Sequence, residues 1–172
     1  MRRPGDPRGT DAEFVAFMAA RSSQLYRSAY LLTTTTHGAE DLMQTALAKA
    51  YAAWPRVRRA DDPVAYVHGI LLKTFLSERR RRSSSELPVA EQPDASSHDP
   101  DPTDRLALAA ALARLSPTDR AVVVLRFWED RTVAQTAQDL GLTEPAVKNR
   151  SLRALRELRT LLDAPIPNGQ HS

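Results

Sequence analysis

The feature that most constrains the fold is a stretch near the middle of the chain, from Ser83 to Asp104. It contains four prolines and six acidic residues but no lysine or arginine. A segment with so little apolar surface cannot offset the conformational entropy that folding removes, so it predicts a flexible acidic linker over residues 84–104. The segment on each side is long enough for a small domain, and the 172 residues are therefore expected to form two units.

Before the linker, apolar residues recur with helical spacing. Thr10 and Glu13 match a capping box, which predicts the start of a helix. A polar run at residues 33–38 predicts the end of that first helix or helix pair, and the next helix is expected to stop at Pro55. A disordered tail is expected at residues 1–11.

The last helix before the linker has a start signal and a basic end. Asp62 is expected to cap it, with Pro63 at its first position, and four arginines at 79–82 suit the negative end of its dipole. These three or four helices make up the predicted first unit, residues 12–83.

Capping patterns also divide the chain after the linker. Helix starts are predicted at three places: Ser116–Pro117 with Asp119 in the first turn, Thr132 with Gln135, and Thr143. Gly141 is expected to end the helix before the last one. No segment alternates in the manner of a strand, so the predicted fold class is all-α. The second unit is expected over residues 105–163, followed by a disordered tail at 164–172.

The strongest local signal runs from Thr132 to Arg159. A short amphipathic helix, a turn containing Gly141 and a longer basic helix have the sequence form of a helix-turn-helix. At about 100° per residue, one face of the long helix is expected to cover the core: Val147, Ser151, Ala154, Leu155, Leu158 and Leu162. The candidates for contact with duplex DNA are Thr143, Glu144, Lys148, Asn149, Arg150 and Arg153.

These residue types suit duplex recognition. Arginine forks onto guanine, asparagine pairs with adenine, glutamate accepts from cytosine and lysine neutralises phosphate. The alternative interpretation is an ordinary amphipathic helix whose arginines face water.

Two further basic segments lie in the first unit. From Tyr51 to Tyr66, aromatic residues alternate with arginines, a combination that stacks on unpaired bases and follows a phosphate backbone. The alternative is that Tyr51 and Trp54 share a helical face with Leu47 and belong to the core. The arginines at 79–82 are predicted to contact phosphate, with a solubilising helix end as the alternative.

Signals for catalysis are poor. The chain has no cysteine, its histidines lack metal-ligand spacing, and no glycine-rich phosphate loop is present, so neither an enzyme nor a metal or other cofactor is expected. His98 stands beside serines and Asp99, but in the predicted linker, where no geometry is held. No secretory signal or membrane-length apolar run is found, and a cytoplasmic location is expected.

The order of these features resembles the extracytoplasmic-function (ECF) sigma factors of the sigma-70 superfamily, and most closely their SigE-like branch. Residues 39–44, AEDLMQ, resemble the acidic start of conserved region 2, and AYVHGILLKTFLSERRRR resembles its end. The run from LARLSPTDRAVVVLRFWED to RALRELR resembles region 4. The likeness covers about residues 12–82 and 105–162.

The resemblance implies a non-enzymatic subunit that binds core RNA polymerase and directs initiation at specific promoters. The expected contacts with the polymerase β′ clamp helices are Asp41, Leu42 and Gln44. The expected contacts with the melted minus-10 element are Trp54, Arg56, Arg58, Tyr66, His68, Lys73, Arg79 and Arg80. The second unit would read the minus-35 duplex and contact the β flap, and an anti-sigma factor is a further candidate partner.

Members of this family commonly carry Asn at the position of Lys73, which leaves the minus-10 preference open. Two alternatives to the sigma factor are kept. A stand-alone helix-turn-helix regulator would bind duplex DNA tightly without polymerase. A sigma-like adaptor or decoy would bind polymerase without reading DNA, and would have no need of Asn149 and Arg153.

Overall fold

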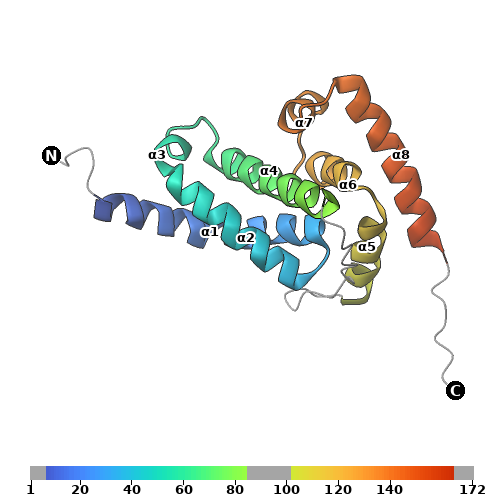
Figure 1. Cartoon of the computed structure of the whole chain (residues 1–172), viewed down its shortest axis with the longest axis horizontal. Helices are drawn as coiled ribbons and strands as arrows, with labels where there is room; N and C mark the ends of the chain where they lie inside the picture. Colours follow the sequence, from blue (N-terminus) through green and yellow to red (C-terminus); the bar gives the residue numbers. More distant parts are fainter. Residues whose placement is uncertain (1–6, 85–101, 165–172) are drawn as a thin grey trace, which may run out of the picture. The chain divides into compact units, whose positions relative to one another are not determined.

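The computed structural model describes residues 7–84 and 102–164, and all the regular structure in these ranges is helical (Figure 1). The all-α prediction is therefore confirmed. The chain divides between Gln92 and Pro93 into two compact units, each with its own core. Most of the predicted linker, His98 included, lies outside the described residues, as do the first six residues and 165–172.

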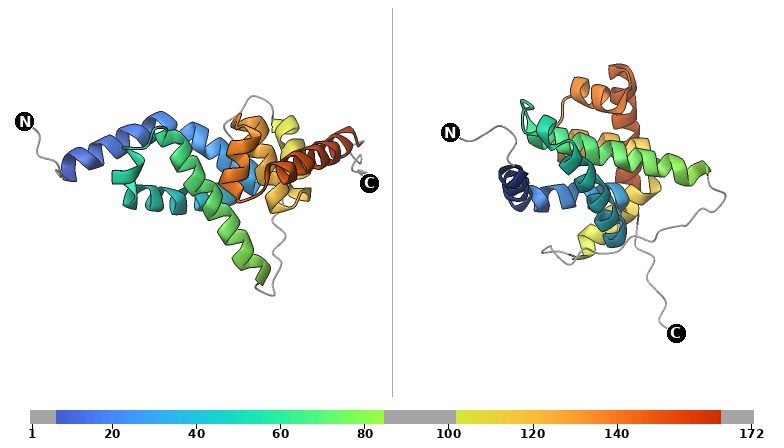
Figure 2. Two further views of the ribbon diagram at one scale, coloured as in Figure 1. Left: turned by 90° about the horizontal axis from the view of Figure 1, so that it is seen from above. Right: turned by 60° about the vertical axis from the view of Figure 1, so that its left-hand side comes forward.

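The first unit is built from α1 (Pro7–Thr33), α2 (Thr36–Ala52), the single turn α3 (Trp54–Val57) and α4 (Pro63–Ser84). Helix α2 packs against both α1 and α4, as Figures 1 and 2 show from three directions. The largest side chains that are fully buried in this unit come from the three long helices: Leu25, Leu32, Leu42, Leu71 and Phe75.

The first helix begins earlier than its capping pattern predicts. It starts at Pro7, so the capping box at Thr10 is wrong, and residues 7–11 of the predicted tail are helical. The extra turn has a physical reason. Asp11 accepts a hydrogen bond from the Tyr51 hydroxyl at 2.5 Å, and the Phe14 ring meets the Tyr51 ring edge-on at 5.2 Å between centroids.

A turn of threonines separates α1 from α2, which confirms the predicted polar break. The hydroxyl of Thr33 donates to the carbonyl oxygen of Ala29 at 2.8 Å, and Thr34 has a left-handed φ of 65°. The Thr35 hydroxyl then accepts from the amide of Gly38 at 3.0 Å and caps α2. The polar run therefore ends one helix and starts the next with its own side chains.

The remaining boundaries of this unit follow the prolines. Asp62 accepts from the amide of Ala65 at 3.0 Å, and α4 begins at Pro63, as predicted. The expected stop at Pro55 is wrong in detail. Helix α2 already ends at Ala52, and Pro55 lies in the first turn of α3, where its missing amide hydrogen costs nothing.

The second unit contains α5 (Pro102–Arg114), α6 (Pro117–Val123), a π-helical segment η1 (Val124–Trp128), α7 (Val133–Leu140) and α8 (Glu144–Asp163). Val122, Ala137 and Val147 form a cluster where α6, α7 and α8 meet. The helix predicted to start at Pro117 passes after Val123 into η1, where Phe127 and Trp128 are half exposed.

The predicted capping signals of this unit are confirmed. Ser116 caps α6 by accepting from the amide of Asp119 at 3.2 Å, and Thr132 and Gln135 form a reciprocal capping box. Gly141 ends α7 with a φ of 64°, a left-handed conformation that favours glycine, and Thr143 caps α8.

Two glycines give a matched test of this packing. In Gly38→Ala, the new methyl would lie 2.7 Å from the Thr35 hydroxyl oxygen and 3.0 Å from the Thr33 Cβ. We expect the free energy of unfolding to fall by about 1–3 kcal/mol. Gly69→Ala in α4 meets nothing within 4 Å, so it should raise the free energy by up to about 1 kcal/mol through helix propensity. Urea unfolding of both variants measures this, and equal effects would contradict the packing at Gly38.

Candidate nucleic-acid interface

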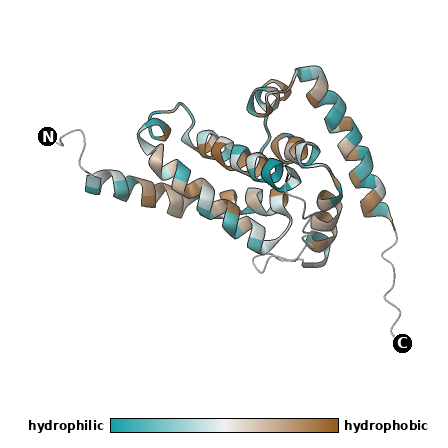
Figure 3. Ribbon diagram, viewed as in Figure 1, coloured by the Kyte–Doolittle hydropathy of each residue, from teal (hydrophilic) through white to brown (hydrophobic). Residues whose placement is uncertain are grey.

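Helices α7 and α8 form the predicted helix-turn-helix. The amide of Leu142 donates to the carbonyl oxygen of Ala137 at 2.9 Å, which closes the turn, and α8 packs on α5, α6 and α7. Hydrophilic and hydrophobic residues alternate along α8 (Figure 3). The predicted core face is confirmed for Val147, Ser151, Ala154 and Leu158 but wrong for Leu155 and Leu162, which are 38% and 47% exposed.

The start of α8 presents polar side chains to solvent. Glu144, Lys148 and Asn149 are exposed, and Arg153 keeps 62% of its side chain exposed. We call these four residues the duplex surface. Thr143 is exposed as well. Its hydroxyl accepts a hydrogen bond from the amide of Ala146 at 3.3 Å and so caps the helix.

Two of the predicted DNA-binding arginines are tied to an acid on another helix. Asp119, in the first turn of α6, is only 5% exposed. Arg150 donates from Nη1 to its Oδ1 at 2.7 Å, and Arg153 donates from Nη2 to Oδ1 and Oδ2 at 3.1 and 3.0 Å. In the sequence, Asp119 stands out only as an acid near a helix start, because its partners lie 31 and 34 positions away.

The same contacts determine the ionisation of Asp119. Burial disfavours the carboxylate and would raise its pKa, but hydrogen bonds from Arg150 and Arg153, together with their positive charges, outweigh burial. The pKa of Asp119 therefore lies below its ordinary value of 3.8, and the group is charged at neutral pH.

In the first unit, three predicted contact residues are buried. Leu42 is 0% exposed, Trp54 4% and His68 6%. Leu42 belongs to the core that α2 shares with its neighbours, and the Trp54 ring meets the rings of Phe14 and Phe17 at 5.3 Å between centroids. We therefore correct the interpretation of these three as direct contacts, and for Trp54 the alternative core interpretation holds.

The other predicted residues of this unit reach solvent. Arg56, Arg58, Tyr66, Lys73 and Arg80 are exposed, and Arg79 is half-buried. Arg58 pairs with Glu13 of α1 at 3.1 Å, an exposed ion pair between the start of α1 and the loop after α3. The Arg79 guanidinium lies 5.4 Å from the centroid of the Phe75 ring.

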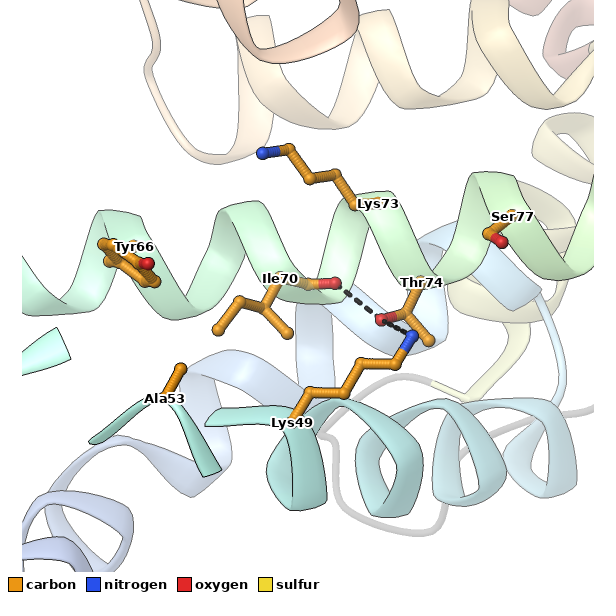
Figure 4. A pocket seen from close by; sticks show the side chains of 7 residues that line it. All are labelled: Lys49, Ala53, Tyr66, Ile70, Lys73, Thr74 and Ser77. Carbon is orange, nitrogen blue, oxygen red and sulfur yellow. Dashed lines mark hydrogen bonds between the residues drawn. The ribbon is translucent and has the colours of Figure 1, made fainter. Parts of the chain in front are cut away.

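A shallow pocket of about 390 Å³ opens between α2 and α4, and two of these predicted residues line it. Lys49 of α2 donates to the hydroxyl of Thr74 at 3.2 Å, and that hydroxyl donates to the carbonyl oxygen of Ile70 at 2.7 Å. Figure 4 shows this chain of bonds, with Tyr66 further along α4 and the Lys73 side chain extending away from α2. The pocket thus combines two cations, hydroxyl groups and an aromatic ring.

The predicted polymerase contacts at the start of α2 differ in exposure: Leu42 is buried, and the other two reach solvent. Asp41 and Gln44 are exposed, and Asp41 lies 3.2 Å from His37 one helical turn earlier.

In the described parts of the chain, no three His, Asp or Glu side chains are grouped to hold a metal ion. None of the helices described there is both long and apolar enough to cross a membrane.

Comparison with known proteins gives this geometry a family. Residues 17–85 match the model of sigma-70 region 2, and residues 105–158 match that of sigma-70 region 4. The chain is 35% identical over 158 residues to the RNA polymerase sigma-E factor of Streptomyces avermitilis, covering 91% of this chain and 88% of that one. It is 32% identical over 165 residues to the ECF sigma factor SigL of Mycobacterium tuberculosis, covering 90% and 93%.

A solved structure shares the fold. The sigma factor RpoE from Bartonella quintana, solved with the anti-sigma factor NepR, has a TM-score of 0.73 at 24% identity, covering 90% of this chain and 99% of that one. A region 2 followed by a region 4 defines a two-domain transcription initiation factor. The chain belongs to the ECF sigma factors of the sigma-70 family, so it binds core RNA polymerase and directs transcription from promoter DNA. These matches do not favour a stand-alone regulator or a decoy.

The pKa of Asp119 predicts a loss of stability in acid. Because the folded-state pKa is lowered, the contribution of the carboxylate is present above the ordinary value of 3.8 and disappears as the pH falls through the folded-state pKa. Asp119→Asn should lower the free energy of unfolding at pH 7 by about 1–3 kcal/mol. The gap between variant and wild type should close below pH 3.8, as measured by urea unfolding. A gap that does not depend on pH would contradict the ion pairing.

Proposed function

We propose that the two units divide promoter recognition, with the duplex surface of α8 reading the minus-35 element and the α3–α4 region holding the melted minus-10 strand. The observation that carries this proposal is the start of α8. A helix packed on its own domain along one side exposes Lys148, Asn149 and Arg153 on the other. Those side chains match the chemistry of base edges and phosphates in a major groove.

For the minus-10 strand, the support comes from exposed cations beside an aromatic residue. Arg56, Arg58 and Arg80 offer positive charge, and Tyr66 offers a partly exposed ring. Lys73 adds a cation beside the pocket between α2 and α4. Unpaired bases stack on such rings while cations follow the phosphates. Trp54 and His68 are buried, so in this proposal they hold the α3–α4 region in place and do not contact the strand.

For polymerase, we propose that Asp41 and Gln44 contact the β′ clamp helices, with Leu42 anchoring α2 in the core, and that the second unit contacts the β flap. RpoE of Bartonella quintana was solved with the anti-sigma factor NepR, and we extend that type of partner to this chain. The protein acts without catalysis of its own, in the cytoplasm, where the polymerase works.

Run-off transcription tests the proposed function directly. Core RNA polymerase would be assayed with and without the protein on a library of promoter fragments. Initiation that depends on the protein and on the promoter sequence supports the proposal and yields the promoter. Core binding without initiation would favour a decoy, and tight duplex binding without core would favour a stand-alone regulator.

Substitutions on the duplex surface should separate base contacts from phosphate contacts. Asn149→Ala should lower holoenzyme affinity for the selected promoter by about 5- to 150-fold and relax selectivity at minus-35. Lys148→Ala should weaken binding to all DNA sequences alike. It should also reduce the salt slope, the slope of log affinity against log salt concentration, by about one. The control is Arg159→Ala, an exposed residue about three turns further along α8, which should change neither quantity. Binding titrations at several salt concentrations measure these effects.

Lys73 offers a test of the minus-10 proposal. Lys73→Asn replaces a cation with the residue common in this family, so we expect a new order of base preferences at minus-10 and a salt slope lower by about one. Ser77→Ala lines the same pocket without a change of charge and should keep the wild-type order. Initiation rates on single-base variants of the minus-10 element measure this, and an unchanged order in Lys73→Asn would exclude Lys73 from base selection.

A further inference from the structure

The two arginines that share Asp119 do not have equal access to a ligand. Arg150 is 33% exposed and Arg153 62%, while the Asp119 side chain is only 8% exposed. Both arginines come from one side of α8, less than a turn apart, and the acid comes from α6. The contact therefore fixes two long cationic side chains against the body of the domain.

The geometry leaves part of the Arg153 fork open. Its Nη2 donates to both carboxylate oxygens, and no hydrogen bond to Asp119 involves its Nε or Nη1. A guanidinium has five N–H donors in a rigid plane, so holding one corner orients the other donors. Arg150 reaches the same carboxylate at 2.7 Å, the shortest of these contacts, from a less exposed position.

The carboxylate itself is held in place. Asp119 lies in the first turn of α6, where its backbone amide donates to the capping hydroxyl of Ser116 at 3.2 Å. A buried acid on a capped helix is a firm anchor. A flexible arginine on a helix surface loses rotamer freedom when it binds, and an anchored arginine has already lost it.

We propose that Asp119 is a positioning residue for promoter recognition: it presents Arg153 to the minus-35 duplex, and Arg150 serves as a brace that does not contact DNA. This inference rests on the proposed role of α8 in duplex reading. It differs from the sequence-based interpretation, which gave Arg150 and Arg153 the same task.

The proposal makes a prediction opposite in sign to simple electrostatics. Asp119→Asn removes a negative charge close to DNA, and by charge alone it should tighten binding at every sequence. If Asp119 positions Arg153, the same substitution weakens binding to promoter DNA with an intact minus-35 element. Binding to promoter DNA whose minus-35 element has been replaced stays unchanged. The ratio of the two affinities separates these outcomes.

The experiment uses holoenzyme made with the full chain and the promoter selected in the transcription assay, with its minus-35 element intact or replaced. For Asp119→Asn, we expect the ratio of affinities to fall by about 5-fold or more, the lower end of the effect of losing one base contact. Asp119→Glu should recover part of it. Arg153→Ala should lower the ratio similarly, and adding Asp119→Asn to it should change nothing more.

Two controls separate positioning from stability. Thr132→Ala removes the capping box of α7 but keeps Asp119 and its helix cap, so it should destabilise the fold without changing the affinity ratio. Arg150→Ala should leave the salt slope unchanged, since a brace neutralises no phosphate. A reduced ratio in Thr132→Ala, or a salt slope reduced by about one in Arg150→Ala, would overturn the inference.

The remaining outcomes are also decisive. If wild-type holoenzyme does not distinguish intact from replaced minus-35 DNA, the proposed reading by α8 fails and this inference fails with it. If wild type does distinguish them and Asp119→Asn binds as selectively or more tightly, the proposed function stands and the positioning role of Asp119 is overturned.

Discussion

The second unit depends on two buried charges next to each other in α6. Asp119 is 5% exposed and faces the arginines of α8, while Arg120 is 4% exposed and faces the end of α5. Arg120 donates to the carbonyl oxygens of Leu112 and Leu115 at 2.8 and 3.1 Å. Both carbonyls lie at the end of α5, beyond the reach of the usual helical amide four residues further along. One turn of α6 therefore joins three helices. Removing Arg120 would take a donor from these backbone carbonyls, and removing Asp119 would release Arg150 and Arg153 from α6.

This arrangement also explains how a helix as short as α6 can hold α5 and α8 together. The helix proper spans only Pro117–Val123 and then passes into η1, so packing along its length is limited. Its position is determined by directed bonds from its first turn and by Val122, which joins the cluster with Ala137 and Val147. Directed bonds fix orientation more narrowly than apolar contact does. The bonds from Arg150 and Arg153 to Asp119 in that turn add a directed contact to the packing of α8 on α5, α6 and α7.

Local chemistry was predictable from the sequence, and long-range contact was not. The caps at Thr132, Thr143 and Ser116 need residues only three positions apart, so a short pattern is sufficient to find them. The burial of Leu42, Trp54 and His68 depends on which neighbouring helix covers each face, and periodicity alone does not contain that information. The same reason applies to the early start of α1. The side chains that stabilise its first turns lie about 40 positions away, and a capping rule cannot register them.

Both units fix a segment that carries cations, but they do so with different interactions. Each must hold a loop or helix start that carries cations, and each uses an acid from another helix. In the first unit that acid, Glu13, is half exposed beside Arg58, and an exposed pair of this kind is worth only about 0–1 kcal/mol. The loop must therefore be held mainly by the rings of Phe14 and Phe17 around the buried Trp54. In the second unit the acid is buried, so ionic contact can do what aromatic packing does in the first. The aromatic residues of the first unit thus support the loop that carries its cations. Under the proposed minus-10 role, we expect substitution of Trp54 to act through the position of this loop.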